Sequence, residues 1–302
     1  MKRVCVLGGR GFVGQSLCRL LAGNDWLVRV PSRRLAGTYD PLRILAGVET
    51  VQCDIHDLSR LETLFTNCDA VINLVGILNE KGSDGSGFHH AHVELTHKVI
   101  HACQNQGISR LLHMSALHAD AEHGPSHYLR SKGEAEQLVI EAEQHGLQAT
   151  RFRPSIIFGP GDSFFNRFAS LLQFAPVFPL ACPGTRFAPI YVEDVARAFM
   201  LSLTDDKTIG QAYNLCGPNI YTLKELVNYT ALCCGYRRMI IGLNDSASAL
   251  QARMLGLLPG KPMSYDNYLS LTVDSICEEA FPARFGTPTS IEEVVPEYLY
   301  RG

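Results

Sequence analysis

The sequence predicts an α/β fold in which a doubly wound parallel sheet is joined to a smaller, mixed C-terminal lobe. Short runs rich in β-branched residues alternate with longer helical patterns through the first half of the 302-residue chain, which is typical of βαβ units. A glycine-rich turn directly follows the first of these apolar runs. Beyond Arg153-Pro154 the alternation loosens and prolines accumulate, so we expect a less regular second lobe there.

The spacing of the apolar residues predicts where the strands and helices lie. We predict strands near 3–7, 27–31, 49–52, 70–74, 110–115 and 149–153, and helices near 12–23, 58–67, 88–106 and 126–145. In the second half we expect helices near 163–174 and 193–203 and a strand near 189–192, followed by Tyr213-Asn214-Leu215 and a helix from Leu223. The predicted domains are a sheet domain over 1–155, to which segments near 186–216 return, and a substrate lobe over 156–302.

Composition excludes several classes of protein. With 46% hydrophobic residues, 19% charged residues and a formal net charge of -3, the chain is neither disordered nor basic enough to have nucleic acid as its main partner. The sequence contains no run of about 20 apolar residues that would predict a membrane span, and no apolar signal region follows the N-terminal Met-Lys-Arg. We expect a cytoplasmic protein, with peripheral contact to a membrane as the alternative.

The chain has ten cysteines but no Cys-x-x-Cys pair. Cys5, Cys18 and Cys103 lie within apolar periodic runs, so we predict reduced cysteines that behave as small buried hydrophobic residues. The vicinal pair Cys233-Cys234 has a redox role as its alternative interpretation, with buried packing preferred.

A glycine-rich turn after the first strand predicts a dinucleotide site. It reads Gly8-Gly9-Arg10-Gly11-Phe12-Val13-Gly14, and it stands between an apolar strand and an amphipathic helix. In this context the turn offers backbone N–H groups to a pyrophosphate, so the sheet is predicted to be of the Rossmann type. An ordinary turn is the alternative interpretation.

The second strand favours NADP(H) over NAD(H). A site for NAD places a carboxylate there to bind the ribose hydroxyls, whereas this strand leads into Arg33-Arg34. Two guanidinium groups suit a 2′-phosphate, and Arg10 adds a third positive group. The alternative is that both arginines belong to a solvated loop, and NAD(H) then remains a candidate.

Three residues form a candidate catalytic set. Tyr128 and Lys132 are separated by four positions, which places both side chains on one face of a helix. A tyrosine is a poor acid or base at neutral pH, but a nearby ammonium favours its phenolate. Ser115 ends the fifth strand, where we expect its hydroxyl to polarise a carbonyl beside the tyrosine.

In this order the motifs resemble those of the short-chain dehydrogenase/reductase superfamily, in particular its extended NAD-dependent epimerase/dehydratase branch. The likeness is stronger still to the atypical subgroup that contains the NADPH-binding accessory subunit of mitochondrial complex I and its bacterial relatives. It is carried by Asn73-Leu74-Val75-Gly76, Met114-Ser115-Ala116-Leu117, Tyr128-Leu129-Arg130-Ser131-Lys132 and Gly184-Thr185-Arg186-Phe187-Ala188-Pro189. The resemblance implies that Tyr128 and Lys132 also bind the cofactor, and it adds as cofactor-binding residues Asp54, Ile55, Asn73, Val75, Gly76, Pro154 and Ile156.

The resemblance implies three functions. The first is hydride transfer at an alcohol or carbonyl carbon of an unidentified small molecule, as in an oxidoreductase or epimerase-like enzyme. The second is a non-catalytic NADPH-binding assembly or redox-sensing protein with a respiratory-complex or quinone-related partner. The third is a nucleotide-sugar epimerase or dehydratase, which two departures put in doubt: Phe187 stands where those enzymes carry an arginine, with Arg186 displaced by one, and Ser115 is alone at its strand end.

Other features are assigned structural roles. His97 and His101 are spaced like zinc ligands on a helix, but no further ligand set accompanies them, so we predict no metal site. The glycine-rich segment 82–87 is expected to form a flexible loop at the mouth of the site, with a substrate lid as one interpretation. Residues 171–180 are expected to line the substrate cleft, with contact to a lipid surface as the alternative.

Overall fold

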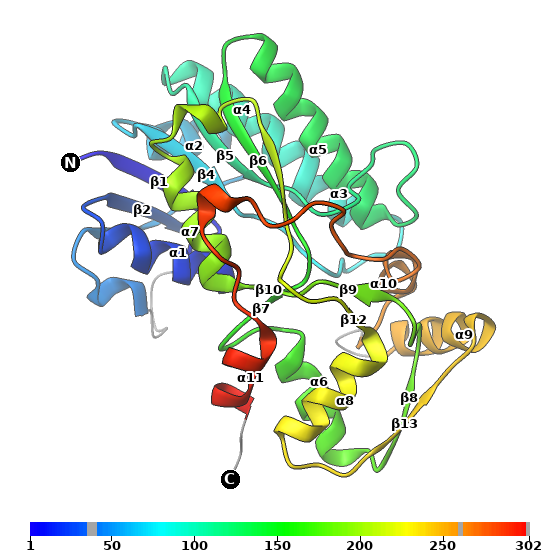
Figure 1. The fold of residues 1–302 in the computed structure, drawn as a ribbon. Coiled ribbons are helices and arrows are strands. Elements are labelled where there is room, and N and C mark those ends of the chain that lie inside the picture. The colour runs from blue at the N-terminus through cyan, green and yellow to red at the C-terminus, as the bar shows by residue number, and fades with distance from the viewer. Residues whose placement is uncertain (35–40, 259–261, 300–302) are drawn as a thin grey trace.

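A computed structural model describes residues 1–34, 41–258 and 262–299, and in this part of the chain a seven-stranded sheet forms the centre of the molecule (Figure 1). The strand order is β11-β6-β5-β4-β1-β2-β3, and neighbouring strands are parallel. Since parallel strands all end at one edge, the residues that follow them meet there. The predicted α/β fold is confirmed. The strands are β1 (Arg3–Leu7), β2 (Leu27–Ser32), β3 (Val48–Gln52), β4 (Ala70–Asn73), β5 (Arg110–Met114), β6 (Gln148–Pro154) and β11 (Ala212–Leu215).

Helices cover both faces of this sheet, and each face has its own buried cluster. Val4 of β1 points into one cluster together with residues of α1 and α7, and Cys5 points into the other together with residues of α2, α4 and α5. Both faces of β1 are therefore buried, as is typical of parallel sheets. The helices are α1 (Phe12–Ala22), α2 (Leu58–Phe65), α4 (Leu95–Asn105), α5 (His127–Gln144) and α7 (Val192–Ser202).

The predicted helix over 88–106 is not continuous. It is divided into α3 (Ser86–His89), a π-helical segment (His90–Glu94) and α4. The wider π turn changes which side chains face the sheet, and such turns are frequent at functional sites.

The second half of the chain builds a small lobe below the sheet in the view of Figure 1. Its core contains Phe158, Phe165, Leu226, Ile240 and Val295. β11 leaves this half and pairs with β6, so the second half also contributes to the sheet. The other elements are β7 (Ile157–Phe158), α6 (Phe165–Phe174), β8 (Val177–Leu180), β9 (Arg186–Phe187), β10 (Ile190–Tyr191), β12 (Tyr221–Thr222), α8 (Leu223–Cys233), β13 (Met239–Gly242), α9 (Asp245–Gly256), α10 (Tyr265–Ser270), α11 (Ile291–Leu299) and 3-10 turns at Pro41–Ile44, Asp206–Thr208 and Ala283–Phe285.

Candidate functional site

The glycine turn between β1 and α1 contains close backbone approaches that a side chain would block. Gly8 has a positive φ of +80°, which favours glycine. A Cβ atom on Gly9 would lie 2.8 Å from a methyl of Val30, and one on Gly14 would lie 2.3 Å from the carbonyl oxygen of Gly8. α1 begins after Gly11 without a side-chain cap, at Phe12 and Val13, so its first N–H groups are available to an anion. The turn therefore fits a dinucleotide pyrophosphate.

Arg10 connects this turn to the end of β2. Its guanidinium donates to the Ser32 hydroxyl and, at 2.8 Å, to the Arg34 carbonyl oxygen. Arg33 and Arg34 are exposed immediately after β2. Three arginines thus gather at the carboxyl end of β2, where a dinucleotide bound over the glycine turn would extend its adenosine half.

The end of β4 turns sharply beside α5. Asn73 accepts a hydrogen bond of 3.1 Å from the Val75 N–H through its side-chain oxygen. A Cβ atom on Gly76 would lie 3.2 Å from Nζ of Lys132, so this loop and the lysine are in close contact. Three predicted cofactor residues thereby meet a predicted catalytic residue.

α5 holds Lys132 beneath the ends of β4 and β5. The helix begins at Ser126, whose hydroxyl accepts the Leu129 N–H at 3.1 Å. Lys132 is buried, and its ammonium donates to the carbonyl oxygens of Met114 at 3.0 Å and Val75 at 3.4 Å. Burial lowers the pKa of Lys132 to about 8, against an opposing effect of the Glu136 carboxylate.

Tyr128 is half-buried on the same helix, next to aromatic rings. Its ring lies edge-on to Phe88 and His92, with centroid distances of 6.0 and 5.7 Å. Burial raises the pKa of Tyr128 to about 12, so its phenol is protonated at neutral pH.

His92 is a site residue that the sequence did not reveal. It lies in the π-helical segment, within the predicted helix over 88–106. His92 is buried: its Nε2 accepts the Ile77 N–H at 3.1 Å, and its Nδ1 is 2.8 Å from the Ser131 hydroxyl. Burial, aided by Lys132 and His113, lowers the pKa of His92 to about 2, so the ring that contacts Tyr128 is neutral. No motif in the sequence distinguishes it from the neighbouring histidines His89 and His90.

Ser115 lies at the end of β5, but its hydroxyl is bound elsewhere than at Tyr128. It donates to Glu136 at 2.6 Å. This buried carboxylate also accepts hydrogen bonds from Arg153 and lies 3.6 Å from Arg151. The carboxylate thus accepts the hydrogen bond that Ser115 would otherwise donate to a carbonyl oxygen.

The remaining predicted cofactor residues flank this centre. Asp54 is exposed after β3, where one of its oxygens accepts the His56 N–H at 3.0 Å, and Ile55 is half-buried beside it. Pro154 ends β6, and Ile156 packs against the core of the small lobe.

A segment of the small lobe, residues 264–277, crosses the site and is called the strap below. At its start, the Asp266 carboxylate accepts the N–H groups of His127 and Tyr128 at 2.7 and 3.2 Å. Further along, Asp274 binds Arg186 by two hydrogen bonds of 2.7 and 2.8 Å. The strap therefore caps the N-terminus of α5, and Arg186, the displaced candidate for a nucleotide-sugar diphosphate, is held by it.

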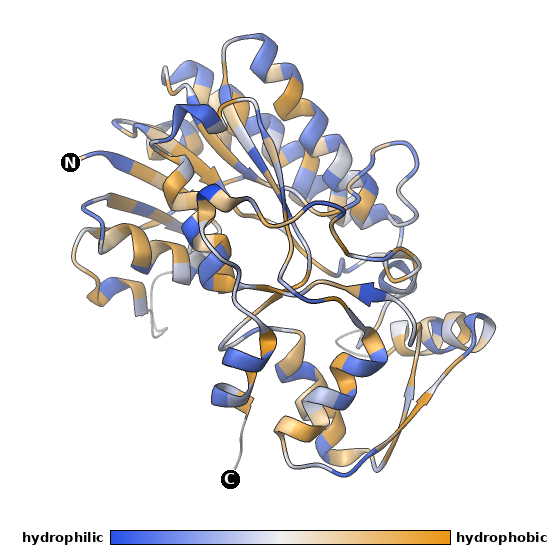
Figure 2. Cartoon of the chain, in the orientation of Figure 1, coloured by the Kyte–Doolittle hydropathy of each residue, from blue (hydrophilic) through white to orange (hydrophobic). Residues whose placement is uncertain are grey.

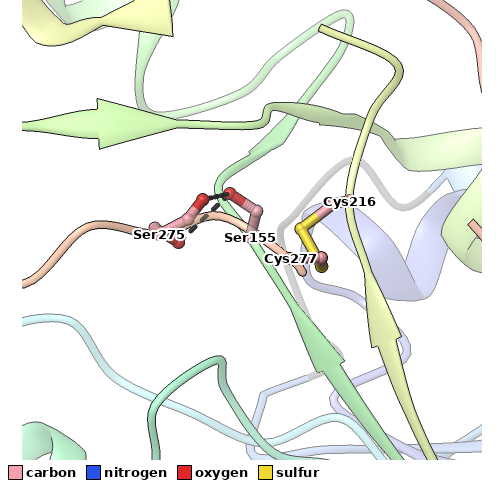
Figure 3. Close-up of a disulfide and its surroundings, with 4 residues drawn as sticks. All are labelled: Ser155, Cys216, Ser275 and Cys277. Atoms are coloured by element: carbon pink, nitrogen blue, oxygen red, sulfur yellow. Dashed lines mark hydrogen bonds between the residues drawn. A yellow bond between two sulfur atoms is a disulfide. The ribbon is translucent and has the colours of Figure 1, made fainter. Parts of the chain in front are cut away.

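The prediction that all cysteines are reduced is wrong for two of them. Cys216, just after β11, and Cys277, at the end of the strap, form a disulfide (Figure 3). The two are 61 residues apart and meet because Ser275 pairs with β9 and accepts a 2.6 Å hydrogen bond from the Ser155 hydroxyl. Local spacing carries no sign of such a pairing. The other eight cysteines, Cys233 and Cys234 included, form no disulfide in the described residues, and the argument for a reducing compartment loses part of its basis.

Hydrogen bonds to two carboxylates hold the glycine-rich loop in this structure. Glu80 accepts the N–H groups of Gly85 and Gly87 at 2.8 Å each, and Asp84 binds Ser86 as α3 begins. An open cavity of about 260 Å³ lies between this loop and α5, lined by residues that include His89, His127 and Arg130.

Among the described residues, no three histidine, cysteine or acidic side chains are grouped as a metal site, His97 and His101 included. None of the helices described is long and apolar enough to cross a membrane.

Comparisons with known proteins agree with this architecture. A sequence profile of the NAD dependent epimerase/dehydratase family matches residues 4–216. The mitochondrial NADH dehydrogenase [ubiquinone] 1 alpha subcomplex subunit 9 of Arabidopsis thaliana is 32% identical over 227 residues, which cover 73% of this chain and 55% of that protein. The chain thus spans little more than half the length of this relative.

Two bacterial reductases are matched over more of their length. The ceramide reductase of Caulobacter vibrioides is 30% identical over 80% of this chain and 74% of the reductase. The 2-alkyl-3-oxoalkanoate reductase of Stenotrophomonas maltophilia is 28% identical over 78% of this chain and 77% of that enzyme. Among solved structures, MoeE5 in complex with UDP-glucose and NAD has a TM-score of 0.67 at 22% identity, covering 80% of this chain and 85% of its own, which is a likeness of fold.

Proposed function

The chain belongs to the NAD-dependent epimerase/dehydratase family, and from that premise we propose that it is an NADP(H)-dependent oxidoreductase acting at an alcohol or carbonyl carbon. The observation that carries this proposal is the arrangement of α5. Tyr128 and Lys132 share one face of the helix, and the lysine ammonium lies buried beneath the ends of β4 and β5. The glycine turn opens at the same edge of the sheet.

The residues around the glycine turn fit an NADP(H) molecule. At Gly9 and Gly14 a Cβ atom would collide with Val30 and with the Gly8 carbonyl oxygen, so the absence of side chains there lets the turn close tightly. The first N–H groups of α1 then point to where the pyrophosphate would bind. Arg10, Arg33 and Arg34 supply the charge that a 2′-phosphate needs. We therefore expect Arg33→Ala combined with Arg34→Ala to weaken NADPH binding about tenfold or more and to leave NADH binding nearly unchanged. Equal losses for the two cofactors in fluorescence titrations would remove the argument for NADP.

Tyr128 is the proposed acid or base. Because its phenol is protonated at neutral pH, it is suited to give a proton to a carbonyl oxygen, which is the reductive direction. Lys132 binds the cofactor's ribose and favours the phenolate once the proton has left. The nicotinamide, when bound, supplies or accepts the hydride. Ser115 orients the substrate oxygen only if its hydroxyl leaves Glu136, so its part in the proposal depends on that movement.

The two reductases give independent support. This chain covers about three quarters of each of them and little more than half of the complex I subunit. Since their names specify a ceramide and a 3-oxoalkanoate, ketones on alkyl chains are the first substrates to test. A nucleotide sugar is the third choice, because Arg186 is bound to Asp274.

NADPH oxidation with a panel of such ketones tests the proposal. We expect turnover by the natural protein and a loss of about a hundredfold or more in Tyr128→Phe, since acid–base catalysis contributes that much. Tyr236→Phe is a matched control, because Tyr236 lies in the small lobe beneath Arg238. No turnover with any member of the panel, or equal turnover in Tyr128→Phe, would refute the enzymatic proposal.

A second function has support of its own: a binding or assembly protein that holds NADPH without turning it over. The ammonium of Lys132 is satisfied by two carbonyl oxygens, and the hydroxyl of Ser115 is bound to Glu136, so the catalytic set is tied into the structure. The relative in mitochondrial complex I agrees with a respiratory-complex partner. This function predicts NADPH that co-purifies, exchanges slowly and is retained unchanged by Tyr128→Phe. Rapid exchange together with turnover would exclude it.

A further inference from the structure

The small lobe exposes an apolar ribbon that a monomeric protein would be expected to bury. β8 and β13 form a two-stranded parallel pair in which Val177 lies opposite Met239 and Pro179 opposite Ile241. These four face solvent, and Met239 is 63% exposed, while Phe178 and Ile240 on the other face join the core. Parallel strands are nearly always covered on both faces. The outer face of this ribbon therefore lacks a cover among the described residues.

α9, which follows β13, is exposed in the same way. It buries the small residues Ser248 and Ala252 against the end of β8, where the Ser248 hydroxyl accepts the Cys182 N–H at 3.1 Å. Its large residues face outward: Leu250 is 60% exposed, Met254 is 62% exposed, and Leu257, just past the helix, is 88% exposed. Their spacing of four and three places them on one side of the helix. This helix keeps its small residues inside and its large apolar residues in solvent.

The ribbon and the helix are adjacent elements at the outer end of the small lobe, away from the seven-stranded sheet (Figure 1), and Figure 2 shows the hydrophobic colour of β13. Gln251 of α9 donates to the Pro179 carbonyl oxygen of β8 at 2.9 Å, so they are in direct contact. The outer surface below means the exposed side chains of Val177, Pro179, Met239, Ile241, Leu250, Met254 and Leu257.

Arginines accompany the outer surface. Arg237 is exposed two positions before Met239, in step with the outward residues of β13, and Arg253 is exposed beside Met254. Residues 164–183 and 229–258, which supply the outer surface and its support, contain four arginines and one carboxylate, Asp245, in a chain whose net charge is -3. These two segments thus carry a local positive charge that the rest of the chain outweighs.

We propose that the outer surface docks on an anionic phospholipid membrane, with its apolar side chains at the acyl boundary and Arg237 and Arg253 on the headgroup phosphates. Exposed aliphatic side chains flanked by arginines are what an interfacial anchor requires. A second copy of the chain fits less well, because it would bring arginines against arginines. The centre of a protein interface is enriched in tyrosine and tryptophan. The outer surface as defined above contains neither, only valine, isoleucine, leucine, methionine and proline.

Docking there would bring the membrane close to the site. α9 packs against α10, with the Arg253 guanidinium 4.9 Å from the ring centroid of Tyr265. α10 in turn caps α5 through Asp266. The inference itself does not depend on the proposed reaction, because it concerns binding alone.

Vesicle sedimentation of the full chain tests this docking. We expect binding to equal-part phosphatidylcholine–phosphatidylglycerol vesicles that weakens with salt, and little binding to phosphatidylcholine alone. Leu250→Gln, Met254→Gln and Leu257→Gln together should reduce the partition coefficient about tenfold or more. Arg237→Gln with Arg253→Gln should reduce it about fivefold for each arginine.

Ile44→Gln is the matched control, because Ile44 is 79% exposed on a 3-10 turn of the sheet domain. It should bind vesicles like the natural protein. Circular dichroism spectra and melting temperatures of all variants check that they are folded. Absence of binding to the anionic vesicles would overturn the inference, as would equal binding by the triple variant. A dimer in light scattering that the triple variant abolishes, without vesicle binding, would assign the outer surface to a second copy instead.

Discussion

Loss of the Cys216–Cys277 disulfide should destabilise the protein by a magnitude that follows from its place in the chain. The bridge closes a loop whose ends are 61 residues apart. In the chain-entropy treatment, a loop of this length corresponds to about 4 kcal/mol of stability at 25 °C. An unfolding entropy of about 2 cal/mol/K per residue over 302 residues converts this into a melting temperature about 6 to 7 °C lower.

Thermal unfolding of Cys216→Ser, with and without a thiol reductant, measures this effect. Reductant should lower the melting temperature of the natural protein and leave that of Cys216→Ser unchanged. Cys68→Ser, which removes a half-buried free thiol, is the control and should still respond to reductant. The reasoning would be refuted if the natural protein melted at the same temperature in both conditions, or if mass spectrometry of the unreduced protein found both thiols free.

Three further predictions concern the site. Gly14→Ala should weaken NADPH binding about a hundredfold in fluorescence titration, because its Cβ atom would lie 2.3 Å from the Gly8 carbonyl oxygen. Gly184→Ala is the control: its Cβ atom would meet nothing within 4 Å, so this variant should bind NADPH normally. NADPH binding should weaken as pH rises through about 8, because the buried Lys132 ammonium exists below that pKa and is lost above it. Lys132→Gln should bind NADPH weakly and show no change in affinity near this pH. If the natural protein showed no such change either, the proposed role of Lys132 in cofactor binding would be refuted. Glu136→Gln should lower the free energy of unfolding by about 3 kcal/mol in urea titrations, because it removes the buried carboxylate that pairs with buried Arg151 and half-buried Arg153, and a loss below about 1 kcal/mol would contradict this.

Local patterns were sufficient for the sheet and for the separate parts of the site. The glycine turn depends on consecutive residues, and the shared face of Tyr128 and Lys132 depends on the helical period, so both can be predicted from a short stretch of chain. The strands of the sheet lie within a few residues of the predicted ones because apolar runs and glycine or proline punctuation are also local. The roles of these residues in binding and catalysis stay predictions until the variants are measured.

Three features of the site depend on distant parts of the chain. His92 reaches Tyr128 because the helix before it widens into a π turn, which interrupts the predicted helix over 88–106. Ser115 binds Glu136, which lies 21 residues away on α5. Asp266 caps α5 from the small lobe, 138 residues from Tyr128. Each contact joins residues that share no periodic pattern, so no short stretch of the sequence predicts the contact.

By itself the sequence determined the fold class, the glycine turn and the helix that carries Tyr128 and Lys132, because each depends on interactions within a few residues. The tertiary structure decided which groups surround them: the carboxylate that accepts the hydrogen bond of Ser115, the strap that caps α5 and the disulfide that joins Cys216 to Cys277. It also decided that β8, β13 and α9 expose their large apolar residues. The physical reason is the same throughout. The burial of a side chain and its hydrogen-bond partners depend on which segments pack together, whereas the sequence pattern shows only which residues could be buried or could form hydrogen bonds.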